Sequence, residues 1–279
     1  SRNWGAETSE QDAEKFRLQV LLLKPFVEHS DLGRLDEESQ CALFTILDDL
    51  FGKTECYAWN ILTLGISLLE VFVSRAQSLV NVPTDKVLSY LSVLLEHNEV
   101  RVRSAVTDLI TALCTKAFNH ESLFDTLIPL LLAGVVKDWT RANTTRVTLL
   151  GTEKNIQMDD TTGWNHLESY VKALHAVFVG IGRVSVTRAV QCMQAHSVAV
   201  SDVLYHNMLH PVAEPTTTTG STADSIDTTT TTTSITTSEL LLTHAGLHIN
   251  RHIRELTFRF VSDLLASSEG TSNNSGGIS

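Results

Sequence analysis

Apolar side chains recur at intervals of three and four residues over most of the chain, which is the period of an amphipathic helix. The pattern is clearest in two stripes at 86–97 and 100–116, which are separated by a short polar corner at Asn98. Pro83 stands where the first of these helices is expected to start, a position that proline favours. The sequence therefore predicts two antiparallel helices joined into a hairpin.

Similar patterns occur on both sides of this hairpin. Segments with the same apolar period occupy 11–28, 36–51, 55–79, 163–178 and 249–264. Pro25 is expected to end or kink the first of these helices, and Gly52 is well placed to end the second. Prolines number only 5 and aromatic residues make up 6% of the chain, a composition that favours helix over strand. The expected fold class is all-α.

The hairpin corner and its second helix, residues 98–113, carry a further pattern. An Asn at the corner is followed by a Val-Arg pair and then by a ladder of Ala and Leu residues. This pattern resembles a HEAT repeat, and weaker copies occur at 163–178 and 249–264. In such a repeat the small Ala105 lets two helices approach closely, and an arginine can cap the corner. The resemblance implies an α-solenoid of antiparallel hairpins of the HEAT or armadillo type.

Two polar insertions divide this array. Residues 137–162 are expected to form a long loop, and residues 211–238, with their threonine runs, a disordered linker that has little apolar surface to bury. The other expected parts are a flexible N-terminus at 1–10, solenoid at 11–136 and 163–210, a last helical hairpin at 239–267 and a disordered tail at 268–279. The start without methionine and the polar end suggest the hypothesis that the chain is a fragment of a longer repeat protein.

The net charge and the cysteines limit the classes of partner and the cellular compartment that we expect. The formal net charge is −11, which disfavours binding to nucleic acid or to anionic lipid because both need clustered Lys and Arg. No apolar run reaches the about 20 residues that span a bilayer. The chain shows no cationic start followed by an apolar stretch, so we expect no secretory leader. The four cysteines are widely spaced and form no CxxC pair. We expect a protein of the cytoplasm or nucleus that binds other proteins.

The sequence predicts a binding function and no catalytic one. Nucleotide-binding, zinc-protease, serine-hydrolase and EF-hand motifs are absent, so we expect neither an enzyme nor a cofactor. Stacked hairpins leave an extended surface that can hold a protein partner, which indicates a scaffold or adaptor. An acidic array of HEAT repeats is similar to nuclear-transport receptors and phosphatase scaffolds, and that similarity implies basic cargo or a catalytic subunit.

The candidate partner-binding residues are an aromatic residue and four arginines near loops: Trp139, Arg141, Arg146, Arg101 and Arg103. Exposed tryptophans near loops often anchor partners, but Trp139 could equally pack against a neighbouring hairpin. Arg141 and Arg146 either contact an acidic partner or keep the first insertion solvated. Arg101 and Arg103 are at the hairpin corner.

A competing hypothesis from another class is a metal-dependent helical enzyme with a site lined by histidines. The chain has 11 histidines, and His244, His248 and His252 are four residues apart, a spacing at which helical side chains can share one metal ion. Against this hypothesis, no cysteine or acidic ligand completes the set nearby, and Asn250 is expected to interrupt the helix. Exposed or capping histidines are the alternative interpretation.

Overall fold

The computed structural model of the chain describes residues 37–76, 82–144, 161–201, 232–246 and 250–272, together with Glu14, Lys15, Arg17, Leu18, Leu21 and Pro25. Within these residues the chain is mostly helical, with one small sheet of two strands. The prediction that the chain is mostly helical is therefore confirmed.

Helices follow one another along most of the described chain. The first half contains α2 (Glu37–Gly52), the 3-10 turn η2 (Thr54–Cys56), α3 (Trp59–Arg75), α4 (Thr84–Leu95), α5 (Val100–Lys116) and α6 (Glu121–Thr144). The second half contains α7 (Thr161–Gly182), α8 (Val186–Ala195), β1 (Ser197–Ser201), β2 (Thr232–Thr236), α10 (Thr237–Leu240), the π-helical turn η4 (Leu241–Ala245) and α11 (Arg251–Ser272).

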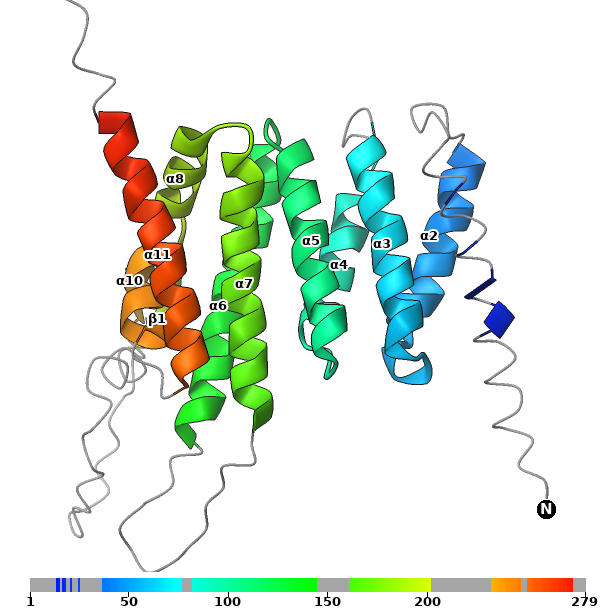
Figure 1. Cartoon of the computed structure of the whole chain (residues 1–279), viewed down its shortest axis with the longest axis horizontal. Helices are drawn as coiled ribbons and strands as arrows, with labels where there is room; N and C mark the ends of the chain where they lie inside the picture. Colours follow the sequence, from blue (N-terminus) through cyan, green and yellow to red (C-terminus); the bar gives the residue numbers. More distant parts are fainter. Residues whose placement is uncertain are drawn as a thin grey trace, which may run out of the picture.

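The long helices form two layers (Figure 1). α3, α5, α7 and α11 lie side by side in one layer, where each contacts the next, while α2, α4 and α6 lie in the other layer. Successive helices from α2 to α7 run in opposite directions, so the chain changes layer at each corner. The C-terminal ends of α3, α5 and α7 consequently lie along one edge of the molecule.

The α4–α5 hairpin follows directly from the apolar pattern. Most of its fully buried side chains recur every three or four positions, among them Val87, Leu91, Leu94, Leu95, Val102, Val106, Leu109 and Leu113. Burying each of these side chains contributes about 1.5–3 kcal/mol relative to leaving it exposed. Pro83 precedes the first residue of α4 as predicted. Buried apolar side chains of the other helices continue this contact between the two layers, and together they form the core of the molecule.

The corner of this hairpin is held by Arg103. Its Nη1 donates hydrogen bonds to the carbonyl oxygens of His97 and Asn98, each at 2.7 Å. The side chain is buried, with 5% of the residue exposed. Burial lowers the pKa of the guanidinium, while the negative charges of Glu168 and Glu99 oppose that shift. The prediction that an arginine caps the corner is confirmed.

The second insertion differs from its prediction at its C-terminal end. Residues 232–238 were expected to belong to the disordered linker, but they form β2 and the start of α10. β2 pairs antiparallel with β1, and Ile235 lies opposite Val198. Ile235 is fully buried, and the threonines around it are β-branched residues that favour strands. One buried apolar residue and a strand partner from 35 positions earlier therefore order this short segment.

The first insertion also has different boundaries. α6 continues to Thr144 and α7 begins at Thr161, whereas the sequence analysis placed the insertion at 137–162. Residues 145–160 lie outside the described part of the chain. None of the helices in the described ranges combines the length and the apolar character that crossing a membrane requires.

Candidate binding cleft

A cleft of about 360 Å³ lies between α3, α5 and the end of α7. This volume is at the lower end of the range typical of ligand sites. The residues that line it come from three separate parts of the chain: Glu70, Ser74, Asp108, Thr111, Ala112, Thr115, Lys116 and Arg183. The cleft is therefore a product of how these helices are placed side by side.

Two hydrogen bonds fix the edge of the cleft. Lys116 Nζ donates to the carbonyl oxygen of Ala76 at the end of α3, at 3.4 Å. Thr115 Oγ1 donates to the carbonyl oxygen of Gly180 in α7, at 3.1 Å. The same hydroxyl lies 2.7 Å from the carbonyl oxygen of Thr111 one turn earlier. Side chains at the end of α5 thus join its two neighbours in the layer.

Gly180 sets the distance between α5 and α7. A Cβ at this position would lie 2.7 Å from the carbonyl oxygen of Thr111 and 2.7 Å from Cys114 Cβ. Both contacts are far closer than van der Waals separation, and one of them is to backbone. Only glycine therefore permits the close approach that brings Arg183, three residues later, to the cleft.

The cleft carries charges of both signs. Glu70 and Asp108 supply carboxylates, and Lys116 and Arg183 supply cations. The Asp108 and Arg183 side chains are exposed, and neither forms an ion pair within the described residues. The bond of Lys116 to a neutral carbonyl leaves its charge unneutralised. Asp108, Lys116 and Arg183 are therefore available to charged groups of a ligand.

The predicted residues of the hairpin corner have separate roles. Arg101 is exposed, and its guanidinium carbon lies 4.2 Å from the centroid of the Trp59 ring. This cation–π contact joins the starts of α3 and α5. Arg103 is buried at the corner and has little surface to offer a partner. Neither residue lines the cleft.

The other predicted site residues lie mostly outside the described side chains. Trp139 and Arg141 are in α6, but their side chains are not described, and Arg146 lies outside the described residues. His244 is in η4 with its side chain not described, and His248 is also outside the described part. His252 is exposed in the first turn of α11.

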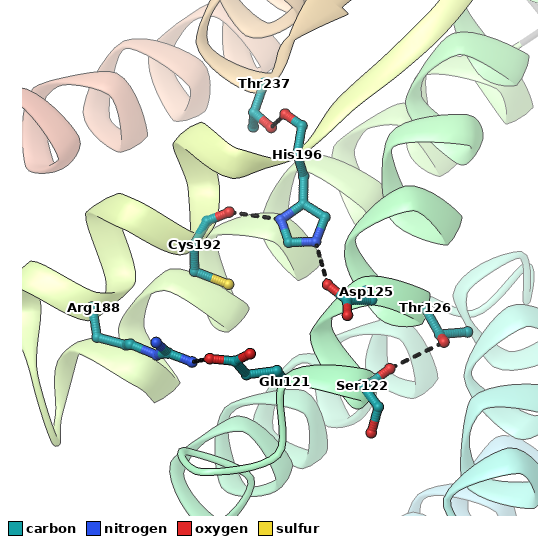
Figure 2. A network of polar contacts seen from close by, with 8 residues as sticks. All are labelled: Glu121, Ser122, Asp125, Thr126, Arg188, Cys192, His196 and Thr237. Carbon is teal, nitrogen blue, oxygen red and sulfur yellow. Dashed lines mark hydrogen bonds and ion pairs between the residues drawn. The ribbon is translucent and has the colours of Figure 1, made fainter.

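A second polar cluster joins α6 to α8 and α10 (Figure 2). Glu121 forms an ion pair with Arg188 at 2.6 Å, and Asp125 lies 3.3 Å from His196 Nε2. His196 Nδ1 lies 2.7 Å from the carbonyl oxygen of Cys192. The Thr237 hydroxyl completes the cluster by donating to the carbonyl oxygen of His196 at 3.2 Å.

The residue types Cys192, His196 and Asp125 are those of a nucleophilic triad, but the geometry differs from one. Both ring nitrogens of His196 face oxygen atoms, Nδ1 the Cys192 carbonyl and Nε2 the Asp125 carboxylate, and neither forms a hydrogen bond with the Cys192 thiol (Figure 2). Burial raises the pKa of Cys192 to about 11, and a thiol in that form is a weak nucleophile. The cluster therefore holds α8 against the start of α6.

Among the described residues, no group of three or more His, Cys, Asp or Glu side chains is placed to hold a metal ion. Comparison with protein-family models, with curated proteins and with solved structures finds no match to this chain. The cleft cannot be recognised in the sequence, because its residues carry no motif and come from three separate parts of the chain. The α5 face with Asp108, Thr111, Thr115 and Lys116 was the one pattern that could have suggested a polar surface.

Proposed function

We propose that this chain is a protein-binding scaffold or adaptor, and that it binds its partner on the layer formed by α3, α5 and α7. The observation that carries the proposal is the cleft on this layer, where Asp108 and Arg183 have no charged partner within the described residues. A concave site with unpaired charges of both signs suits a ligand that carries complementary charges.

The arrangement of the helices supports the same proposal. Antiparallel hairpins stacked in two layers, as in a HEAT-type solenoid, present one layer as a continuous surface. The capped corner at Arg103 and the tightly packed α5–α7 contact at Gly180 make that surface rigid. A rigid surface loses little conformational entropy when a partner binds. The finer expectations from the HEAT resemblance, a nuclear-transport-like or phosphatase-scaffold-like binder, stay predictions.

Site-specific photo-cross-linking tests the proposal. The photoreactive residue p-benzoylphenylalanine replaces Ala112 inside the cleft in one variant and the exposed Ser89 of α4, in the opposite layer, in a control variant. We expect a discrete protein adduct from soluble cell extract at the cleft position, which excess unmodified chain suppresses. The absence of an adduct at Ala112, or the same adducts from both variants, would contradict the proposal.

A further inference from the structure

Two opposite charges of the cleft, those of Asp108 and Lys116, are separated along α5. Asp108 and Lys116 are eight positions apart on this helix, which places them about 12 Å apart along its axis at 1.5 Å per residue. Lys116 reaches the end of α3, and Thr115, one residue earlier, contacts Gly180 of α7, three residues before Arg183. The cations thus lie at the C-terminal edge of the layer, and the Asp108 carboxylate lies nearer its middle.

This separation limits the class of ligand. A free amino acid or another small zwitterion carries its two charges only a few ångströms apart, so it cannot meet both ends of the cleft. Nucleic acid is disfavoured because the Glu70 and Asp108 carboxylates would face its phosphates. An extended polypeptide advances about 3.3 Å per residue, so it covers 12 Å in about four residues.

The alternation of side chains along an extended chain agrees with this length. Side chains at positions i and i+4 of an extended segment point to the same side. A segment lying along the cleft can therefore direct a basic side chain toward Asp108 and an acidic side chain toward Lys116 and Arg183. All three of these protein side chains are exposed, so they can reach such a segment without a change in the fold.

We propose that the cleft binds an extended peptide segment that carries one basic and one acidic residue four positions apart. This inference rests on the proposed protein-binding function and specifies the chemistry of the partner. Each ion pair is partly exposed and contributes modestly, so the isolated segment binds weakly. The affinity falls as salt is added, because exposed ion pairs are screened.

Fluorescence anisotropy with labelled nonapeptides tests the inference on the full chain. Two probes, STKTVSETS and its charge-exchanged form STETVSKTS, place the charges four positions apart and cover both directions of the segment. A third probe, STKTESVTS, places them two positions apart. We expect one of the first two probes to bind about two- to fivefold more tightly than the third, since only the longer spacing engages both ends of the cleft.

Charge reversal identifies the site. We expect Asp108→Lys to weaken binding of the preferred probe about tenfold, and a probe with glutamate in place of its lysine to recover affinity for this variant. Asp85→Lys is the matched control, because Asp85 is an exposed aspartate of α4 in the other layer; it leaves binding unchanged. Circular dichroism confirms that both variants keep the helical fold.

Three results would overturn the inference: no probe binds, the probes bind equally well at both spacings, or the two charge reversals have the same effect. These results are distinguishable from a failure of the proposed function. If the Ala112 cross-link captures a partner whose binding is insensitive to Asp108→Lys, the scaffold proposal stands and the peptide chemistry is wrong. If the cross-link captures nothing and no probe binds, both are wrong.

Discussion

Arg103 shows how a single residue can determine a corner of the fold. Its guanidinium satisfies two carbonyl oxygens at the end of the α4–α5 turn from a buried position. We expect Arg103→Met to lower the free energy of unfolding by about 2–3 kcal/mol, because the variant leaves both carbonyl oxygens without this charged donor. Urea denaturation followed by circular dichroism measures the change.

Arg101→Met is the matched control for this prediction. Arg101 is exposed and contacts the Trp59 ring, and a contact of this kind contributes about 0.5–1 kcal/mol at an exposed site. Arg103→Lys tests the geometry, since a single ammonium reaches both carbonyl oxygens less well than the planar guanidinium fork. Equal losses for Arg101→Met and Arg103→Met would show that the corner does not depend on the buried hydrogen bonds.

Gly180 has a comparable effect through the absence of a side chain. We expect Gly180→Ala to destabilise the protein by about 1–3 kcal/mol, because the added methyl overlaps the Thr111 carbonyl oxygen and Cys114 Cβ. At Gly182, two residues later, an added Cβ meets only Ala189 Cβ, at 3.9 Å. Gly182→Ala is therefore the control, with a neutral or slightly stabilising effect through helix propensity. Thermal unfolding of the two variants gives the comparison.

At the scale of elements, α11 is joined to α7 through His175. His175 Nε2 lies 3.0 Å from Asp263 Oδ2, and its ring is 4.9 Å from the Phe260 ring. Burial lowers the pKa of His175, and Arg259 also lowers it, while Asp263 raises it in part. The folded state therefore prefers the neutral ring. This preference stabilises the fold fully above about pH 6.5, the ordinary pKa of histidine, and is lost as the pH falls through the folded pKa.

We accordingly expect an NMR titration of the His175 ring to give a midpoint below 6.5 in the folded protein. In Asp263→Asn the midpoint falls further, because the variant loses the negative charge that raises the pKa. In His175→Gln the decrease in unfolding free energy between pH 7.5 and pH 5.5 becomes smaller than in the unmodified chain. A His175 midpoint at or above 6.5 would show that burial does not dominate at this contact. An unchanged midpoint in Asp263→Asn would show that the Asp263 carboxylate does not raise the pKa of His175.

The sequence predicted helices well and the small sheet poorly, for a physical reason. The α4–α5 hairpin was predicted within two residues because its apolar period, Pro83 and the polar corner are local features. The strand β2 was missed because its one buried apolar residue, Ile235, depends on pairing with β1 across a long interval of sequence. Threonine runs alone do not distinguish a strand from a solvated linker.

The cleft could not be predicted from the sequence for a related reason. The polar face of α5 is visible in the sequence, but which groups of α3 and α7 lie opposite it depends on how the helices are shifted along one another. Gly180 and the bond from Thr115 fix that shift. A glycine inside an apolar helix gives no indication of which neighbour approaches it. The ends of the cleft therefore became visible only in three dimensions.

At the scale of the whole molecule, the arrangement of the helices predicts where the structure is most stable. α5 has α3 on one side and α7 on the other, while α2 and α11 lie at opposite ends of the described array (Figure 1). If the stability of each hairpin depends mainly on its nearest neighbours, as in a HEAT-type solenoid, the ends open more readily than the centre.

Native-state hydrogen exchange measures this difference. We expect the amides of α5 and the second half of α7 to exchange slowest, and those of α2 and α11 to exchange by local opening that costs less free energy than global unfolding. Gly180→Ala provides the sharper comparison, because it weakens the α5–α7 contact in the centre and raises exchange in both helices while α2 changes less. Equal opening free energies in all four helices would instead show that the two layers unfold as one cooperative unit, and the solenoid interpretation would then be wrong.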